Sequence, residues 1–198
     1  MSIVQLEKST THTNIFKNNI QKNCMLSEEE WSRIFNKLTI KTAPKNTVLL
    51  MHGEYENSGR FILEGHIKVD YHDNEFYVFD FRSPMDTVCD TISVFEKKLS
   101  HFTLSTITKC TWIDIDVKNL IELTNANGAF KAYMLEKINY YMKRGYENAA
   151  FIRSHAAEDR YKLFCKENPE IIKHAKLGDI ASYLGMTQQS LSRIRKSL

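Results

Sequence analysis

Side chains that can hydrogen-bond to nucleic acid gather near the C-terminus of the chain. Amide and guanidinium groups can form paired hydrogen bonds with one base, whereas hydroxyl and ammonium groups suit phosphate oxygens. Arg193 is the candidate for the main base contact, with guanine as its natural partner, and Gln188 and Gln189 suit adenine. The predicted DNA-contacting residues are Thr187, Gln188, Gln189, Ser190, Ser192, Arg193 and Lys196. Their chemistry indicates recognition of double-stranded DNA rather than catalysis.

The surrounding residues predict a helix-turn-helix that places these side chains on an outer face. Gly185 supplies the positive φ angle that a tight turn between two helices needs. Thr187 is the expected N-cap of the second helix, residues 187–197, and Met186 before it can pack against Leu191. The apolar positions of the two helices are Ile180, Ala181, Leu184, Leu191 and Ile194. The alternative is an ordinary pair of helices within a helical domain.

Composition predicts a globular protein without a membrane segment. The chain has 198 residues, of which 42% are apolar and 26% charged, enough for a sizeable core. No run approaches the roughly 20 apolar residues of a membrane span. Residues 1–14 lack the apolar core of a secretion signal. We therefore expect a cytoplasmic protein with no membrane partner.

Positive charge is unevenly placed along the chain. Residues 153–198 contain 9 Lys and Arg against 5 Asp and Glu, a net charge of +4. The rest of the chain has a net charge of −1. This asymmetry is expected when the segment with the helix-turn-helix approaches phosphate and the remainder does not.

The cysteines give no support for a metal centre. Cys24, Cys89, Cys110 and Cys165 are far apart and form no Cys-x-x-Cys pair. Structural zinc and iron–sulfur clusters are therefore not expected, and neither is any other cofactor. Free, mostly buried thiols are the simpler interpretation.

Between about residues 39 and 116, short β-rich runs alternate with turn residues. The predicted strands are 47–51, 60–63, 66–71, 75–82, 102–108 and 111–116. Several short strands at this spacing are typical of an all-β sandwich or roll. In the run 75–82, alternation predicts that Phe79 and Phe81 share the inward face, while Val78 and Asp80 share the other.

Helices are predicted on both sides of the β-rich region. Ser27 and Glu30 have the spacing of a capping box that begins a helix. Helices are also predicted over 117–124, 129–154 and 156–168. The long helix repeats small and apolar residues at alternating spacings of three and four, which favours pairing with the same helix of a second copy. The predicted dimer interface is Leu135, Ile138, Met142, Gly145, Ala149 and Ile152. The alternative is that this helix packs only on its own domain.

The order of β-roll, long heptad helix and helix-turn-helix resembles the Crp/Fnr superfamily of bacterial transcription regulators, in particular its short, Bacteroidetes-type members. The likeness is most specific after residue 156, in the segments 157–161 (Ala-Glu-Asp-Arg-Tyr), 168–170 (Asn-Pro-Glu) and 180–196. In the N-terminal half it depends on Gly53-Glu54 and on 61–65 (Phe-Ile-Leu-Glu-Gly). These form a looser match to the family's cyclic-nucleotide-binding roll.

The resemblance implies an α+β fold in three parts. These are a sensor β-roll with N-terminal helices (1–126), a dimerisation helix (127–154) and an all-α helix-turn-helix domain (155–198). Many relatives continue into a β-hairpin wing, whereas this chain stops at Leu198, so no wing is expected. The resemblance also implies a homodimer that reads a near-palindromic operator on DNA, with RNA polymerase as a further partner.

Departures from the family pattern bear on the effector. Cys89 stands where the family's phosphate-binding segment has glycine, Asp90 stands for glutamate, and no arginine follows at the later position. Without that guanidinium, a cyclic nucleotide is not expected in the family's usual mode. Any effector site should still lie inside the roll. Its candidate residues are Phe61, Phe79, Phe81, Val88 and Asp90. The alternative is that these are ordinary core residues.

Two other classes of function are alternatives to a DNA-binding regulator. A cupin-like metal enzyme needs a His-x-His pair, but His52, His66, His72 and His101 are isolated in sequence. No Ser, Cys or Lys nucleophile motif is present either, so an enzyme is not expected. The third class is a ligand-binding β-roll protein whose helical tail does not bind DNA.

Overall fold

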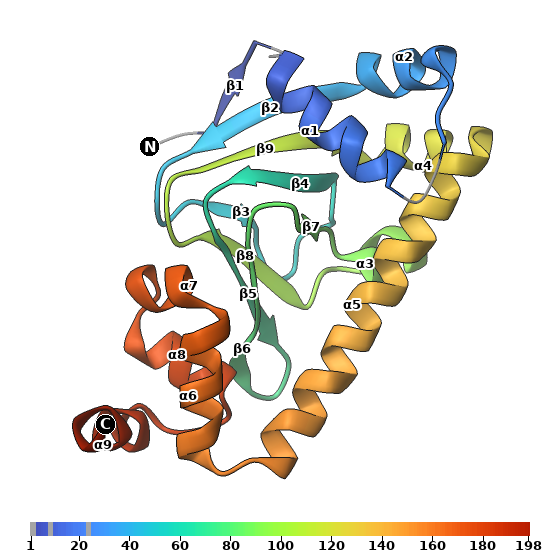
Figure 1. Cartoon of the computed structure of the whole chain (residues 1–198). Helices are drawn as coiled ribbons and strands as arrows, with labels where there is room; N and C mark the ends of the chain where they lie inside the picture. Colours follow the sequence, from blue (N-terminus) through green and yellow to red (C-terminus); the bar gives the residue numbers. More distant parts are fainter. Residues whose placement is uncertain (1–2, 8–9, 23–24) are drawn as a thin grey trace.

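The computed structural model of the chain describes residues 3–7, 10–22 and 25–198. A β-roll forms the N-terminal part, a long helix runs beside it, and the C-terminal helices pack against the far end of the roll (Figure 1). Cys24, predicted to be a free thiol, lies outside the described residues. The described cysteines, Cys89, Cys110 and Cys165, are free thiols, and Cys110 is buried.

Two antiparallel sheets form the roll and confirm the predicted fold class. The first sheet has the strand order β1 (Val4–Leu6), β2 (Leu38–Ala43), β9 (Cys110–Asp116), β4 (Ser58–Glu64) and β7 (Thr87–Val88). The second has the order β3 (Val48–Leu50), β8 (Phe102–Thr106), β5 (Ile67–His72) and β6 (Phe76–Arg82). Fully buried side chains such as Ile62, Ile67 and Trp112 form one core of the roll. Strands β1, β2 and β7 were not predicted.

Helices cover the first sheet and close one side of the roll. The predicted capping box is present, because the Ser27 hydroxyl accepts from the Glu30 amide at 3.2 Å and the Glu30 carboxylate accepts from the Ser27 amide at 2.8 Å. The helices of this part are α1 (Thr10–Gln21), α2 (Glu28–Asn36), α3 (Thr91–Glu96), α4 (Val117–Ala126) and α5 (Gly128–Ser154). No residue range was predicted for α1 or α3, whereas α4 and α5 follow the predicted ranges closely. Within the described part of the chain, no helix combines the length and apolar character needed to cross a membrane.

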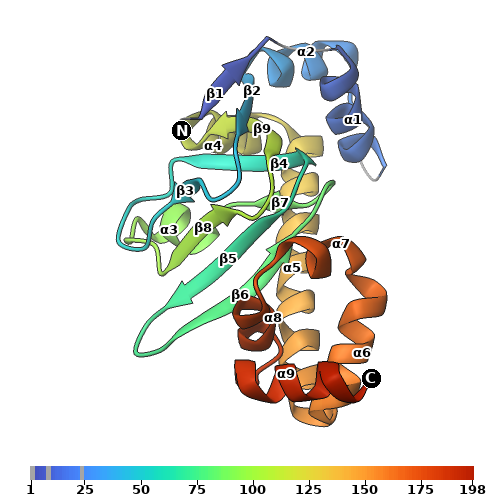
Figure 2. The same cartoon turned by 90° about the vertical axis from the view of Figure 1, so that its left-hand side faces the viewer.

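A helical C-terminal region follows α5 and has its own core. Its helices are α6 (Ala157–Glu167), α7 (Pro169–His174), α8 (Leu177–Tyr183) and α9 (Gln188–Ser197). Tyr161, Phe164, Ile171, Leu184 and Leu191 are buried together in this core. The same cluster contains Val78 and Phe81 of β6, so the core of the helical region continues onto the outer face of the second sheet. Figure 2 shows α8 beside β6.

A β-bulge in β6 interrupts the regular alternation of its side chains. Asp80 pairs with Val69 of β5, and Val78 pairs with Asp70, the next residue of the same strand. Phe79 is therefore an extra residue between two consecutive partners. A bulge of this kind moves the residues on its two sides onto opposite faces of the sheet.

The bulge makes the predicted faces of Phe81 and Asp80 wrong, whereas Val78 and Phe79 lie on the faces predicted for them. Val78 and Phe81 are both 2% exposed and pack with the C-terminal helices, so they share the outer face. Phe79 and Arg82 instead line a cavity inside the molecule. Strict alternation had paired Phe79 with Phe81 on the inward face, because a bulge has no signature in the hydrophobic pattern.

The start of α5 is tied to α2 by one side chain. Asn127 is the N-cap, and its Oδ1 accepts from the Phe130 amide at 2.7 Å. Its Nδ2 donates to Glu30 Oε1 at 2.9 Å, the same carboxylate that closes the capping box of α2. One buried amide therefore positions the long helix against the helices over the first sheet.

Replacing Asn127 with alanine should lower the free energy of unfolding by about 1–2 kcal/mol, because α5 loses its cap and Glu30 loses a donor. Urea denaturation of the two proteins measures the difference. Asn125→Ala removes an exposed asparagine two positions earlier and should change stability by less than about 0.5 kcal/mol. Equal effects of the two substitutions would show that Asn127 does not cap α5.

Candidate DNA-binding surface and effector cavity

The turn between α8 and α9 has the geometry expected of a helix-turn-helix. Gly185 has a φ angle of +62°. The Thr187 hydroxyl accepts from the Ser190 amide at 3.1 Å and caps α9. Leu191 is completely buried, and Met186 packs against the cluster that contains it. The predicted turn, cap and buried face are therefore all present.

The opposite face of α9 is open to solvent. Among the predicted DNA-contacting residues, Thr187, Gln188, Gln189, Arg193 and Lys196 are exposed, while Ser190 and Ser192 are half-buried. Within the described part of the chain, salt bridges were found at neither Arg193 nor Lys196. These two cations therefore face solvent without a competing carboxylate.

Helix α8 is docked on the outer face of β6. The Val78 amide donates to Ser182 Oγ at 2.9 Å, so an edge strand of the sheet is bonded to the helix. The Phe81 ring lies 5.4 Å from the ring of Tyr183 and 6.1 Å from that of Phe164, measured between centroids. These contacts set the position of the helix-turn-helix relative to the roll.

An ion pair accompanies this apolar contact. Lys68 Nζ of β5 lies 3.1 Å from Asp179 Oδ1 of α8 and 3.1 Å from Asp70 Oδ1 of its own strand. All three side chains are largely buried. Lys68 is the shared cation, so removing it would leave two carboxylates without a positive partner in a region of low dielectric constant, which is strongly destabilising.

The inner face of β6 is tied to α5 by a shared carboxylate. Asp80 lies 2.9 Å from Arg144 of α5 and 3.2 Å from Arg82 of its own strand. Arg144 also donates to the Phe81 carbonyl at 2.8 Å and lies 3.6 Å from Asp86. Burial raises the pKa of Asp80, while the two arginines act in the opposite direction. The arginines therefore offset the cost of keeping this carboxylate buried.

Tyr141 of α5 also contacts the roll, beside Arg144 and Asp80. The Thr87 amide donates to its hydroxyl at 2.6 Å, and the hydroxyl donates to Asp86 at 3.2 Å. The guanidinium of Arg82 lies over its ring, 3.8 Å from the centroid. Burial raises the pKa of Tyr141 to about 12, so the hydroxyl keeps its proton near neutral pH. The sequence had singled out none of these residues, because they meet only in the folded chain.

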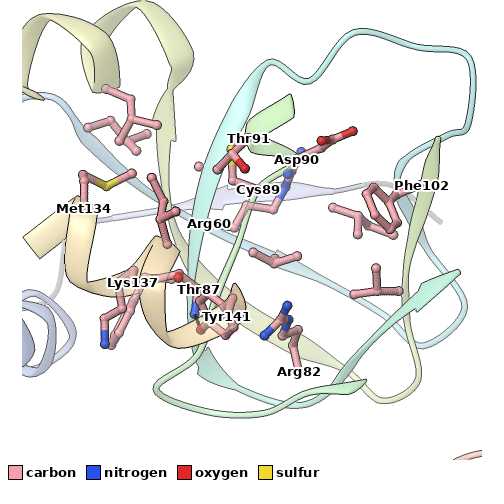
Figure 3. Close-up of a pocket in the computed structure, with 18 of the residues that line it drawn as sticks. Arg60, Arg82, Thr87, Cys89, Asp90, Thr91, Phe102, Met134, Lys137 and Tyr141 are labelled. Carbon is pink, nitrogen blue, oxygen red and sulfur yellow. Dashed lines mark hydrogen bonds between the residues drawn. The ribbon is translucent and has the colours of Figure 1, made fainter. Parts of the chain in front are cut away.

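A cavity of about 520 Å³ lies between the roll and α5. Side chains from both sheets, α4 and α5 line it (Figure 3). Four of the predicted effector residues are part of its lining: Phe61, Phe79, Val88 and Asp90. Phe81 is not, because the bulge turns it towards Phe164 and Tyr183 of the C-terminal region. The prediction that Phe81 belongs to the roll interior is therefore wrong.

The groups that would hold a phosphate are already occupied. Asp90 caps α3 and accepts from the amides of Ile92 and Ser93, both at 3.1 Å. Arg60 donates to both oxygens of Glu56 at 3.0 Å and is bonded to two backbone carbonyls. The amides of Ile92 and Ser93 at the start of α3 are therefore not free to bind a phosphate. Arg60 has few hydrogen-bond donors left for a ligand.

The predicted dimer residues on α5 have different surroundings. Leu135 and Met142 are 53% and 52% exposed. Ile138, Met142 and Gly145 line the cavity, so this stretch of the seam borders it. Ile152 lies beside the turn of the helix-turn-helix, where a Cβ added to Gly185 would come 3.0 Å from its methyl group.

The arrangement of the histidines, cysteines and carboxylates bears on metal binding. Among the described residues, no group of three or more His, Cys, Asp or Glu side chains could hold a metal ion. The rings of His52 and His72 stack at 4.9 Å, and His101 lies 6.2 Å from His52. These histidines, isolated in sequence, thus meet in the folded chain, with His52 and His72 stacked and the ring of His101 tilted by 53° against that of His52.

No family model and no curated protein sequence matches the chain. Solved structures match it over most of its length. A transcriptional regulator assigned to the Crp/Fnr family from Eubacterium rectale has a TM-score of 0.71 and 12% identity, covering 87% of this chain and 83% of its own. The c-di-GMP responsive global regulator CLP of Xanthomonas campestris has a TM-score of 0.66 and 15% identity, and the match covers 86% of this chain and 91% of CLP. FixK2 from Bradyrhizobium japonicum has a TM-score of 0.65 and 15% identity, and the match covers 81% of this chain and 84% of FixK2.

The order of elements and these matches define a class of fold. It is a cyclic-nucleotide-binding-like roll followed by a long helix and a helix-turn-helix. This is the fold of Crp/Fnr transcription regulators, as the resemblance had predicted.

Replacing Phe81 with alanine should loosen the C-terminal helices from the roll, at a cost of about 3–5 kcal/mol. Hydrogen exchange should become faster at the amides of α8. Phe76→Ala is the matched control, because Phe76 lies on the same strand and is 59% exposed. Unchanged protection of α8 in Phe81→Ala would contradict the docking role.

His66 lies where the roll meets α7, with its ring 6.4 Å from that of His174 and its Nδ1 3.0 Å from Ser83 Oγ. Burial and then His174 lower its pKa below 6.5, against the opposing charges of Glu170 and Asp86. The unfolded chain therefore takes up this proton at a higher pH than the folded chain. Stability contributed by neutral His66 is complete above the unfolded pKa and is lost as pH falls towards the lowered value.

The free energy of unfolding should consequently fall more steeply between about pH 7.5 and 5.5 in the natural sequence than in His66→Asn. Denaturation at a series of pH values gives the two slopes. His155→Asn, which removes an exposed histidine, should leave the slope close to that of the natural sequence. Identical slopes for all three proteins would rule out a contribution from His66.

Proposed function

We propose that the protein is a homodimeric transcription regulator that reads a near-palindromic DNA operator through α9. The observation that carries this proposal is the exposed polar and basic face of a capped recognition helix at the end of a Crp/Fnr fold. Arg193 and Gln189 contact base edges, and Lys196 contacts phosphate. Gln188, Ser190, Ser192 and the N-cap Thr187 complete the DNA-binding surface. RNA polymerase is a further partner, and no enzymatic step is assigned.

The second copy pairs along α5, through the seam Leu135, Ile138, Met142, Gly145, Ala149 and Ile152. Exposed apolar side chains at Leu135 and Met142 support this arrangement. Residues 1–126, 127–154 and 155–198 act as sensor, dimerisation helix and DNA-binding domain. A two-fold dimer places its recognition helices in successive major grooves, roughly 34 Å apart.

The cavity is the effector site in this proposal, and β6 links it to the recognition helix. Arg82 on the inner face lines the cavity, while Val78 and Phe81 on the outer face hold α8. A ligand that moves β6 therefore moves the helix-turn-helix. The occupied groups around α3 argue against a cyclic nucleotide bound through its phosphate.

In vitro selection of bound DNA tests the function. A motif with two-fold symmetry and half-sites about one helical turn apart is the expected result. An enriched but asymmetric motif would refute the dimer, and no enrichment at low salt would refute DNA recognition. In the last case the protein would be a ligand-binding roll with a helical tail of another function.

On the selected operator, Arg193→Ala should weaken binding by about 1–3 kcal/mol and relax the preference at one base pair in each half-site. Lys196→Ala is the contrasting variant. It should weaken binding to all sequences equally and reduce the salt dependence by about one phosphate contact per protomer. If Arg193→Ala behaves like Lys196→Ala, Arg193 is a phosphate contact and not a base reader.

A further inference from the structure

The chemistry of the cavity indicates what kind of molecule fits it. Its lining is mostly apolar and includes several aromatic rings and aliphatic side chains. Among them are Phe16, Phe61, Phe79, Phe102, Phe130, Val69, Val88, Leu104, Ile113 and Ile138. Such a lining gains free energy from contact with hydrocarbon and offers little to a ribose or a purine edge.

The charged side chains of the cavity are not equivalent. Arg60 is paired with Glu56 through both carboxylate oxygens, and Asp90 is held by α3 and by Ser100, whose hydroxyl donates to it at 2.7 Å. Lys137 lies at the cavity with its ammonium group 5.3 Å from the centre of the Tyr133 ring. Of the two arginines that line the cavity, Arg60 and Arg82, Arg82 makes fewer hydrogen bonds.

Arg82 is buried and only partly satisfied. Its side chain is 9% exposed, and its single salt bridge joins Nη2 to Asp80 at 3.2 Å. Its Nε and Nη1 are buried without a hydrogen-bond partner in the described structure. Asp80 also serves Arg144, so two guanidinium groups share this carboxylate. A buried donor without a partner destabilises the folded chain, and more so when the donor is charged.

A second polar group of the lining is also unsatisfied. Tyr133 of α5 is 2% exposed, and its hydroxyl is buried without a partner. Figure 3 shows Arg82 and Tyr141 on the same side of the cavity, with Cys89 and Phe102 on other walls. The cavity thus combines a large apolar volume with a cation that has two nitrogen atoms, Nε and Nη1, without a hydrogen-bond partner in the described structure.

We propose that the cavity binds an apolar organic acid, whose carboxylate pairs with Arg82 and whose hydrocarbon part contacts the aromatic lining. A carboxylate is favoured over a neutral acceptor because hydrogen bonds between two charged groups are about twice as strong. This proposal rests on the effector role given to the cavity above. It names an amphipathic acid, rather than a cyclic nucleotide, as the effector.

Calorimetry on the full chain, without DNA, compares decanoate with 1-decanol, which has the same chain length and no charge. Decanoate should bind at one site per protomer, at least about tenfold more tightly than the alcohol. Equal affinities would overturn the proposal, as would the failure of decanoate to bind or a higher affinity for cyclic AMP. This comparison uses the natural sequence and does not depend on a variant that folds.

Arg82→Gln should weaken decanoate binding about tenfold to a hundredfold and leave the affinity for decanol unchanged. Arg82→Lys keeps the charge beside Asp80 and should give an intermediate affinity. Lys137→Gln, which removes one positive charge elsewhere on the lining, should change the affinity for decanoate by no more than a few-fold. An unchanged affinity in a folded Arg82→Gln protein would overturn the proposal.

The outcome is separable from that of the DNA-binding experiment. Decanoate binding by a protein that enriches no DNA would refute the regulator and leave the ligand assignment intact. An enriched operator together with equal binding of decanoate and decanol would support the regulator and refute the ligand assignment.

Discussion

The Asp80 carboxylate is buried between two guanidinium groups that belong to different elements. Arg82 comes from the same strand, and Arg144 comes from the helix that passes the roll. Taking a carboxylate out of water costs several kcal/mol, and the charges opposite it repay this cost only while all three groups stay together. Asp80 therefore fixes the distance between the roll and α5. The cavity, the hydrogen bonds of Tyr141 to Thr87 and Asp86, and the course of α5 towards the C-terminal helices all depend on that distance.

The two faces of β6 give this strand its central place in the molecule. One face contacts the cavity and the ionic cluster, and the other carries Val78 and Phe81 against α8 and α6. An aromatic contact, a backbone hydrogen bond and the Lys68–Asp179 pair all act at the outer face. Since packed interfaces shift between discrete arrangements more readily than they stretch, a movement of the whole strand would act on both faces at once.

Local patterns were enough to predict the helix-turn-helix, the α5 helix and the roll. Gly185, Thr187 and Leu191 each act within a few residues of their partners, so spacing along the chain reveals them. The cavity was harder to foresee, because its decisive contacts join residues far apart in sequence, such as Asp80 and Arg144. The orientation of Phe81 was predicted wrongly because a one-residue bulge reverses every later position while leaving composition and hydrophobicity unchanged.

The bulge at Phe79 also has an evolutionary consequence. Substitutions at Phe79 change the lining of the cavity without touching the residues that hold α8, and substitutions at Val78 do the opposite. Point mutation can therefore adjust what the cavity accepts and how firmly the C-terminal helices are held as two separate traits. Insertion or deletion of a single residue in β6 has no such freedom, because it exchanges the two faces and alters both traits at once.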